Sequence, residues 1–206
     1  MEVILEHLSR NFGPQVVIKN LNYTFLSGNS YAILGGNGSG KSTVLRLVYG
    51  ALTPSEGNVV YKDNNQVLNK DKVPFEISLA GPYLELIEEL TAKEFLSFYY
   101  KFRKPIEGFN SDRILEVCYL QEAQNKEIRN FSSGMKQRLR LGLALLTQSK
   151  LILLDEPTSN LDPQGIEWYR NLLTSHRNGR TLLIGSNHQE KEMDFCQHHL
   201  EAQDWR

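Results

Sequence analysis

A glycine-rich stretch near the N-terminus has the residue types and the spacing of a phosphate-binding loop. Its members are Gly35, Gly36, Asn37, Gly38, Ser39, Gly40, Lys41, Ser42 and Thr43. An apolar run precedes it and apolar residues at helical spacing follow it, so we expect strand, loop and helix rather than a plain glycine-rich turn. Backbone N–H groups and the positive end of the helix dipole suit an anion, and glycines keep side chains out of the way. We therefore expect a nucleoside triphosphate here, with Lys41 at its β- and γ-phosphates and the Ser42 hydroxyl on Mg²⁺.

Two acidic residues, Asp155 and Glu156, follow the apolar run 151–154. A continuous apolar run of this kind is typical of a strand buried on both faces of a parallel sheet. Ligands of open α/β sheets bind at the carboxyl ends of the strands, so both carboxylates should reach the phosphate region. We expect Asp155 to hold Mg²⁺ and Glu156 to polarise a water for in-line attack on the γ-phosphate.

The composition is that of an ordinary globular chain and argues against several classes of protein. Of the 206 residues 40% are apolar, and 23 Lys and Arg nearly balance 24 Asp and Glu, so no basic excess favours a nucleic acid. Cys118 and Cys196 form no CxxC pair, which is typical of a reducing compartment. The N-terminus has acids where a signal peptide needs a basic flank, and no apolar stretch approaches the ~20 residues of a membrane span. We expect a soluble chain whose membrane role depends on a partner.

Strands are expected on both sides of the phosphate loop. Residues 1–30 alternate in the manner of strands, with turns at 12–14 and 27–30. Another strand is predicted at 58–61, followed by a polar loop at 63–72. The apolar run 181–185 predicts a second buried strand beside 151–154.

Helices are expected in three further segments. Helical character covers about 84–120, with Thr91 and Glu94 as a capping box. Leucines among Arg, Lys and Gln predict one amphipathic helix over 132–148. Asp162 and Pro163 are the cap and first residue of another helix, which ends near 178.

In chain order these motifs resemble those of the ATPase subunit of ATP-binding cassette (ABC) proteins, over nearly the whole chain. The set consists of Phe12 as the A-loop aromatic, 35–42 as the phosphate loop, 131–135 as the signature, 151–156 as Walker B, 159–162 as the D-loop and His188 as the switch histidine. Each motif alone is modest, but the ordered set is specific.

The resemblance implies an α/β fold of the P-loop NTPase type. It would have a three-layer core with a mostly parallel sheet, an N-terminal antiparallel β portion and an inserted helical subdomain. Residues 1–206 would form one ABC ATPase domain, with 1–82 and 131–206 in the core and 83–130 in the helical subdomain. Since only 18 residues follow His188, we expect no appended regulatory domain.

The resemblance also implies roles for individual residues, each with a simpler rival. Phe12 would stack on adenine, or else it packs within a hairpin. Ser132, Ser133 and Gly134 would bind the γ-phosphate of ATP at a helix start, or else Ser132 is an ordinary N-cap. His188 would contact the γ-phosphate and help hold the attacking water, or else it is a surface histidine.

Two departures from the family pattern concern the same site. Gly81 or Pro82 stands where the family has the Q-loop glutamine, so water or a nearby residue such as Glu85 would take its place. In the signature, Ser133 replaces the first glycine and Met135 the glutamine. A serine at a helix start still presents its N–H, so we expect the phosphate contact to persist.

The resemblance implies partners as well. One phosphate loop and one signature imply a second ABC ATPase chain, expected to be an identical copy, with two ATP molecules sandwiched head to tail. Closure on ATP would move an integral membrane permease whose cytoplasmic helix docks on about 83–130. The chain would then be cytoplasmic, at the inner face of the membrane, and the permease would hold the transported substrate. The alternatives are a soluble ABC ATPase not involved in transport and a weakly hydrolysing nucleotide-gated binding module.

Overall fold

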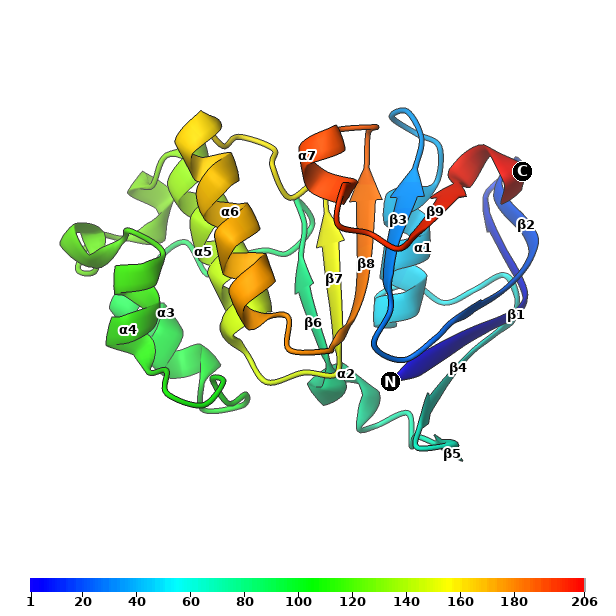
Figure 1. Ribbon diagram of the computed structural model, residues 1–206, viewed down its shortest axis with the longest axis horizontal. Helices are drawn as coiled ribbons and strands as arrows, with labels where there is room; N and C mark the ends of the chain where they lie inside the picture. Colours follow the sequence, from blue (N-terminus) through cyan, green and yellow to red (C-terminus); the bar gives the residue numbers. More distant parts are fainter. Residues whose placement is uncertain (206) are drawn as a thin grey trace.

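The computed structural model describes residues 1–205 and is built around a parallel sheet of five strands (Figure 1). Their order across the sheet is β6-β7-β8-β3-β9, and every neighbouring pair is parallel. The strands are β3 Ser30–Leu34, β6 Ile77–Ala80, β7 Leu151–Asp155, β8 Thr181–Ser186 and β9 His198–Glu201. The runs expected at 151–154 and 181–185 are thus confirmed as buried neighbours, with Leu151 opposite Thr181.

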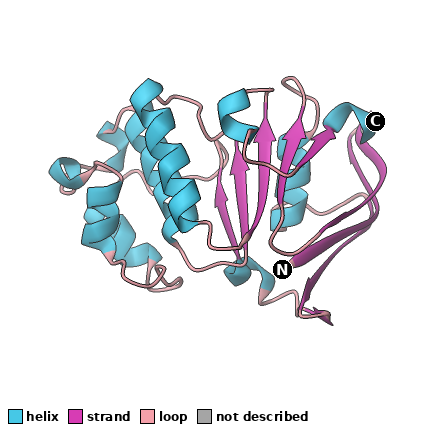
Figure 2. Cartoon of the chain, viewed as in Figure 1, coloured by secondary structure: helices cyan, strands magenta, loops and turns pink. Residues whose placement is uncertain are grey.

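An antiparallel sheet in the order β2-β1-β4-β5 covers one side of the molecule (Figure 2). Its strands are β1 Glu2–Phe12, β2 Gln15–Phe25, β4 Glu56–Asp63 and β5 Gln66–Val67. The prediction of a loop throughout 63–72 is wrong at β5. Asn64 and Asn65 both have positive φ, which suits the two-residue turn of a tight hairpin, so a short strand follows.

The helices are distributed on both faces of the parallel sheet (Figures 1 and 2). They are α1 Lys41–Tyr49, α2 Val73–Glu76, α3 Ala92–Tyr99, α4 Ser111–Val117, α5 Ser133–Leu146, α6 Pro163–His176 and α7 Glu190–Met193, with 3-10 turns at Gln121–Ala123, Ile128–Asn130 and Ala202–Trp205. Within residues 1–205, no helix is both long and apolar enough to cross a bilayer.

Alternate residues of the central strand β7 enter two separate cores. Leu151 and Leu153 pack in the core that contains α1 and the antiparallel sheet, whereas Ile152 and Leu154 pack in the core that contains α5 and α6. Successive strand residues point to opposite faces, so a continuous apolar run is required where both faces are covered. The expected three-layer α/β fold is confirmed.

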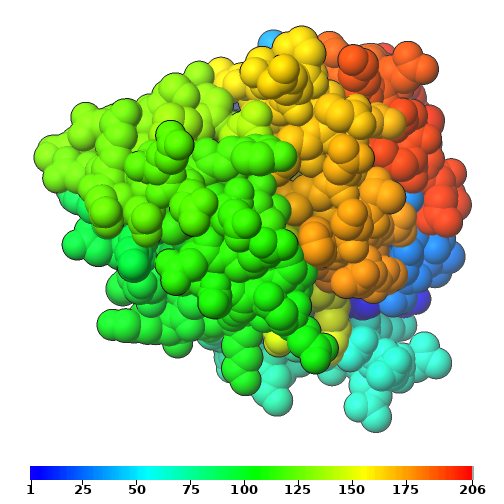
Figure 3. Space-filling model, turned by 60° about the vertical axis from the view of Figure 1, so that its left-hand side comes forward, coloured from blue at the N-terminus to red at the C-terminus, as the bar shows by residue number. Residues whose placement is uncertain are grey.

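The segment 84–90 was expected to be helical, and this prediction is wrong. The helix begins only at Ala92, where Thr91 and Glu94 form the expected capping box. The carbonyls of Glu88 and Leu90 instead accept hydrogen bonds from the backbone N–H groups of Arg129 and Ile128. This long-range pairing uses acceptors that a helix would need. The helices α3 and α4 form a lobe at the edge of the molecule (Figure 3).

Candidate nucleotide site

The glycine-rich loop connects β3 to α1 at the carboxyl edge of the parallel sheet. Gly35, Gly38 and Gly40 have φ of 149°, 75° and 109°, a region that side chains other than glycine rarely adopt. A Cβ on Gly35 would lie 2.6 Å from the Ser39 hydroxyl oxygen. The loop conformation therefore depends on glycines at these positions.

Lys41 places its charge inside this loop. Its side chain is 4% exposed, and Nζ donates to the carbonyls of Gly35 at 2.7 Å and Gly36 at 3.0 Å. Nζ also lies 3.9 Å from Oε1 of Glu156. Residues that are far apart in the sequence thus meet around one ammonium group.

Asp155 ends β7 and is 1% exposed. Neither carboxylate oxygen has a hydrogen-bond partner among the described residues. Burial raises the pKa of Asp155 to about 6, the nearby Ser42 hydroxyl and Lys41 oppose that rise, and Glu156 adds to it. A buried carboxylate without a partner, close to a hydroxyl, provides the oxygen donors that Mg²⁺ prefers. The residues present therefore fit a magnesium ion.

Glu156 follows in a left-handed backbone conformation, and its side chain reaches the phosphate loop. Its φ is 47°, its N–H donates to the Gly185 carbonyl at 2.8 Å, and its side chain is 38% exposed. Left-handed backbone at a residue other than glycine often accompanies a functional site. Together with the loop 37–43 it lines a cavity of about 360 Å³.

The hairpin between β1 and β2 completes this cavity with Gln15 and Val17, which the sequence patterns did not single out. Phe12 pairs with Gln15 in the hairpin but is not one of the cavity-lining residues. Its ring is 41% exposed, with the Arg10 guanidinium 4.5 Å from its centroid. An aromatic ring is therefore available next to the cavity, on the hairpin.

His188 lies in the turn after β8, with φ of 57° and Nε2 3.9 Å from Oε2 of Glu201. The preceding residue, Asn187, donates from Nδ2 to Oδ1 of Asn37 at 2.8 Å. This bond joins the turn to the phosphate loop. Asn187 was not identified from the sequence, because a single asparagine near a strand end has no distinctive pattern.

A buried carboxylate, also not identified from the sequence, joins three segments around the site. Glu192 is 1% exposed and accepts from the Thr158 N–H at 2.9 Å, the Thr158 hydroxyl at 2.5 Å and the Ser186 hydroxyl at 2.5 Å. It thereby ties α7 to the segment that follows β7 and to the last residue of β8. Since Ser186 is two residues from His188, Glu192 stabilises the turn that carries the histidine.

The signature residues lie at the start of α5. Ser132 is the N-cap of α5, and its hydroxyl accepts a hydrogen bond from the Met135 N–H at 3.2 Å. The residue therefore acts as an ordinary N-cap in this chain. Ser132 and Ser133 are exposed, and a Cβ on Gly134 would lie 3.1 Å from the Asn160 carbonyl. A second chain could approach this helix start.

In the segment where the glutamine is missing, Pro82 and Glu85 are exposed and Gly81 is buried. A Cβ on Gly81 would lie 3.1 Å from Cζ of Tyr83 and 3.2 Å from Cβ of Asp155. Tyr83 and Asp155 therefore lie next to the same glycine, whereas the side chain of Glu85 is exposed.

Comparisons with known proteins agree with this arrangement. A family model for ABC transporters matches residues 18–159. The uncharacterized ABC transporter ATP-binding protein YybJ of Bacillus subtilis is 30% identical over 197 residues, which cover 95% of this chain and 89% of that protein. The bacitracin transport ATP-binding protein BcrA of Enterococcus faecalis is 34% identical over 91% of this chain and 62% of its own length. The dimeric structure of MJ0796, a bacterial ABC transporter cassette, has a TM-score of 0.79 and 26% identity, covering 98% of this chain and 95% of that chain.

The chain therefore belongs to the ABC transporter family and is one of its ATP-binding ATPase subunits. This assignment favours a transporter subunit over a soluble ABC ATPase that takes no part in transport. The chain spans most of YybJ but 62% of the length of BcrA.

Proposed function

We propose that this chain hydrolyses ATP with Mg²⁺ in a pocket formed by the phosphate loop and the end of β7, and that it drives a membrane permease. The observation that carries the proposal is the meeting of Lys41 with Glu156 at 3.9 Å beside the buried Asp155. The buried cation of Lys41 suits phosphate binding, and the unpaired carboxylate of Asp155 suits metal binding. The partly exposed carboxylate of Glu156 suits activation of a water molecule.

Each residue would have a distinct role in this pocket. Lys41 would move from the loop carbonyls to the β- and γ-phosphates, and the loop N–H groups would hold the phosphates. Ser42 and Asp155 would hold Mg²⁺, which neutralises charge on the phosphates. Glu156 would polarise the attacking water, with His188 beside the γ-phosphate.

Phe12 would stack on the adenine from the hairpin. The start of α5 would complete the pocket of a second, identical chain through Ser132, Ser133 and Gly134. The exposure of Ser132 and Ser133 supports this proposal, since a buried helix start could not reach another chain. Two such chains would enclose two ATP molecules, and 83–130 would act as the helical subdomain beside a core of 1–82 and 131–206.

The permease would dock in an apolar groove between the core and the helical lobe. This cavity of about 250 Å³ is lined by residues that include Tyr49, Leu84, Phe98 and Phe102. Phe75, Phe98 and Phe102 are all exposed, and apolar side chains gathered at one place mark an interaction site. An amphipathic helix with its apolar face inward is the occupant that suits such a groove. Docking there would place the chain at the cytoplasmic face of the membrane.

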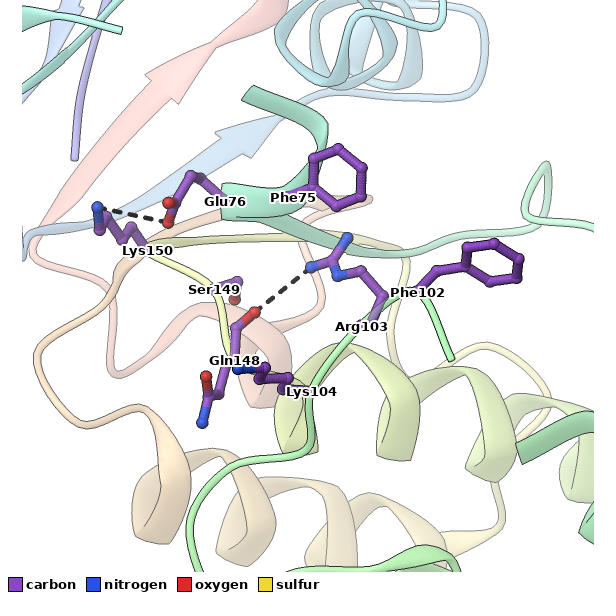
Figure 4. A pocket seen from close by; sticks show the side chains of 8 residues that line it. All are labelled: Phe75, Glu76, Phe102, Arg103, Lys104, Gln148, Ser149 and Lys150. Atoms are coloured by element: carbon purple, nitrogen blue, oxygen red, sulfur yellow. Dashed lines mark hydrogen bonds and ion pairs between the residues drawn. The ribbon is translucent and has the colours of Figure 1, made fainter. Parts of the chain in front are cut away.

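A second pocket, of about 390 Å³, adjoins this groove and shares Phe75, Phe102 and Arg103 with it (Figure 4). Arg103 donates to the Pro74 and Ile77 carbonyls at 2.8 Å and 2.9 Å. Arg103 thus joins the segment after α3 to the segment around α2. These hydrogen bonds hold together two segments that line the groove.

Two variants, Lys41→Ala and Glu156→Gln, test the proposed chemistry. Lys41→Ala should lower ATP affinity by at least about tenfold, because the buried cation at the phosphates is lost. Glu156→Gln should keep ATP binding but lower turnover by about 10²-fold or more, and dimers should accumulate in ATP. Equilibrium binding, phosphate release and sedimentation in Mg-ATP measure these effects.

Unchanged ATP affinity in Lys41→Ala would refute the assignment of the loop, and normal turnover in Glu156→Gln would refute the assignment of the base. Because the Q-loop glutamine is missing, a second candidate function is a nucleotide-gated binding module that hardly hydrolyses ATP. Turnover by the wild-type chain in Mg-ATP separates this candidate from the proposed ATPase.

A further inference from the structure

Tyr83 and Asp155 lie on the same side of one glycine. Gly81 follows β6, the neighbour of β7 in the sheet. A Cβ on this residue would come within 3.1 Å of the tyrosine Cζ and within 3.2 Å of the aspartate Cβ. Cζ carries the hydroxyl, so the polar end of the ring lies next to the same position as the Asp155 side chain. A residue with a side chain in place of Gly81 would separate the two groups.

Both polar groups are buried without a partner. The Tyr83 hydroxyl and both Asp155 carboxylate oxygens have no hydrogen-bond partner among the described residues. Buried polar groups are nearly always hydrogen-bonded, and leaving one unpaired costs free energy. A donor and an acceptor left unpaired around the same glycine indicate a site whose hydrogen bonds are completed only when the ligand is bound.

The ring itself is held from the side of α1. The Arg46 guanidinium carbon lies 5.4 Å from the centroid of the Tyr83 ring, within the range of a cation–π contact. Arg46 is part of the helix that begins with Lys41 and Ser42. The contact therefore fixes the tyrosine relative to the helix that carries the proposed metal-binding hydroxyl.

From this arrangement we infer that Tyr83 is a positioning residue for the hydrated Mg²⁺ of the nucleotide. Its hydroxyl donates a hydrogen bond to the hydration shell of a metal held by Asp155 and Ser42. It thereby supplies the polar group of the missing glutamine. The inference rests on the proposed ATPase function. Within the same segment Pro82 has no side-chain donor and Glu85 is exposed, so neither offers an alternative.

Tyr83→Phe removes the hydroxyl and keeps the ring. Mn²⁺ affinity of the ADP-bound protein, measured by electron paramagnetic resonance, should fall about three- to tenfold, the value of one hydrogen bond to a metal shell. ADP affinity without metal should not change. The Mg²⁺ concentration at half-maximal ATPase activity should rise by the same factor, with the KM for ATP unchanged at saturating Mg²⁺.

The Tm of the metal-free protein is a second readout. If the Tyr83 hydroxyl only stabilised the fold, its removal would lower this Tm. Because the Tyr83 hydroxyl is unpaired, Tyr83→Phe should keep or raise the Tm. The matched control is Tyr61→Phe, since the buried Tyr61 hydroxyl donates to the Val48 carbonyl at 2.7 Å. This control should lower the Tm and leave Mn²⁺ affinity unchanged.

Equal Mn²⁺ affinity in the wild-type and Tyr83→Phe proteins would overturn the inference and leave the ATPase function standing. A lower metal-free Tm in Tyr83→Phe would also overturn it, because the hydroxyl would then be bonded within the chain. Failure of the wild-type protein itself to bind Mn²⁺ with ADP would overturn both the inference and the proposed function.

Discussion

The Asp155 carboxylate has a high free-energy cost in the unliganded chain. It is buried, its oxygens lack hydrogen-bond partners, and Gly185 approaches so closely that a Cβ there would lie 2.7 Å from Oδ1. Burying a charge without a partner destabilises a folded protein. Metal binding would offset this cost, so the residue makes stability depend on the ligand.

Asp155→Asn should therefore stabilise the metal-free chain at neutral pH. The pKa of Asp155 is raised from 3.8 to about 6, so between these values the unfolded chain loses its proton first. The free energy of unfolding consequently falls as pH rises through this window, by up to about 3 kcal/mol. In urea titrations without metal, the variant should exceed the wild type by about 1–3 kcal/mol at pH 7.5, and the gain should vanish near pH 4.

Asp63→Asn is the matched control, with the opposite sign. The hydrogen bond from Lys150, at 2.8 Å, lowers the pKa of Asp63. Its contribution to stability is therefore present at neutral pH and is lost as the pH falls through the lowered pKa, so this variant should lose a little stability at pH 7.5. Equal stability of Asp155→Asn and the wild type at pH 7.5 would show that the carboxylate finds a partner in solution.

At the scale of elements, the packing of α4 against α5 depends on a glycine within a helix. Gly142 lies inside α5, and a Cβ there would be 2.3 Å from Sγ of Cys118, the residue after α4. Cys118 is buried and its pKa is raised to about 12 by burial, so it acts as a packed apolar side chain. The lobe is held to the core partly through this close approach.

Gly142→Ala should lower the free energy of unfolding by about 1–2 kcal/mol, because an overpacking cost of about 2–3 kcal/mol outweighs the gain in helix propensity of about 1 kcal/mol. Adding Cys118→Ala should recover part of the loss, since it removes the clashing sulfur. Urea unfolding of both single variants and the double variant measures the coupling. A neutral or stabilising Gly142→Ala, or strictly additive effects, would contradict the proposed contact.

At the scale of the whole molecule, the nucleotide pocket and the apolar groove are separate but share the segment after β6. Gly81 and Tyr83 lie beside Asp155, and Leu84 lines the groove together with Phe98. A change at the nucleotide can therefore reach the groove through a few residues. Such a connection is what coupling between ATP and a docked helix requires.

Replacing Phe98 and Phe102 by Ser tests the groove. Their ring centroids lie 5.3 Å apart in an edge-to-face arrangement. Loss of two exposed aromatic side chains that docking would bury should weaken docking by about tenfold or more. The fraction of the chain that sediments with membranes containing its permease should fall, while ATP binding remains unchanged. Tyr119→Ser is the control, since Tyr119 is an exposed aromatic residue outside the groove. The docking site would be rejected if the membrane-bound fraction fell equally in the Tyr119→Ser control and the groove variant. It would also be rejected if this fraction did not fall in the groove variant.

Local sequence determined the order of strands and helices around the phosphate loop and the family to which the chain belongs. Glycines at positive φ, the capping box at Thr91 and the apolar run ending at Asp155 follow from backbone sterics, hydrogen bonding and burial, which act over a few residues. Most of the core could therefore be predicted. The short strand β5 and the irregular segment 84–90 could not, because an asparagine turn and long-range backbone pairing decide them.

Only the tertiary structure decided which side chains meet. It placed Tyr83 beside Asp155, joined Asn187 to Asn37 and buried Glu192 against Thr158 and Ser186. Each of these pairs connects different segments, and no local spacing encodes such a distance. The motifs of this chain specify its chemistry because backbone conformation is local, whereas the contacts that adjust the site arise from packing between segments that are distant in the sequence.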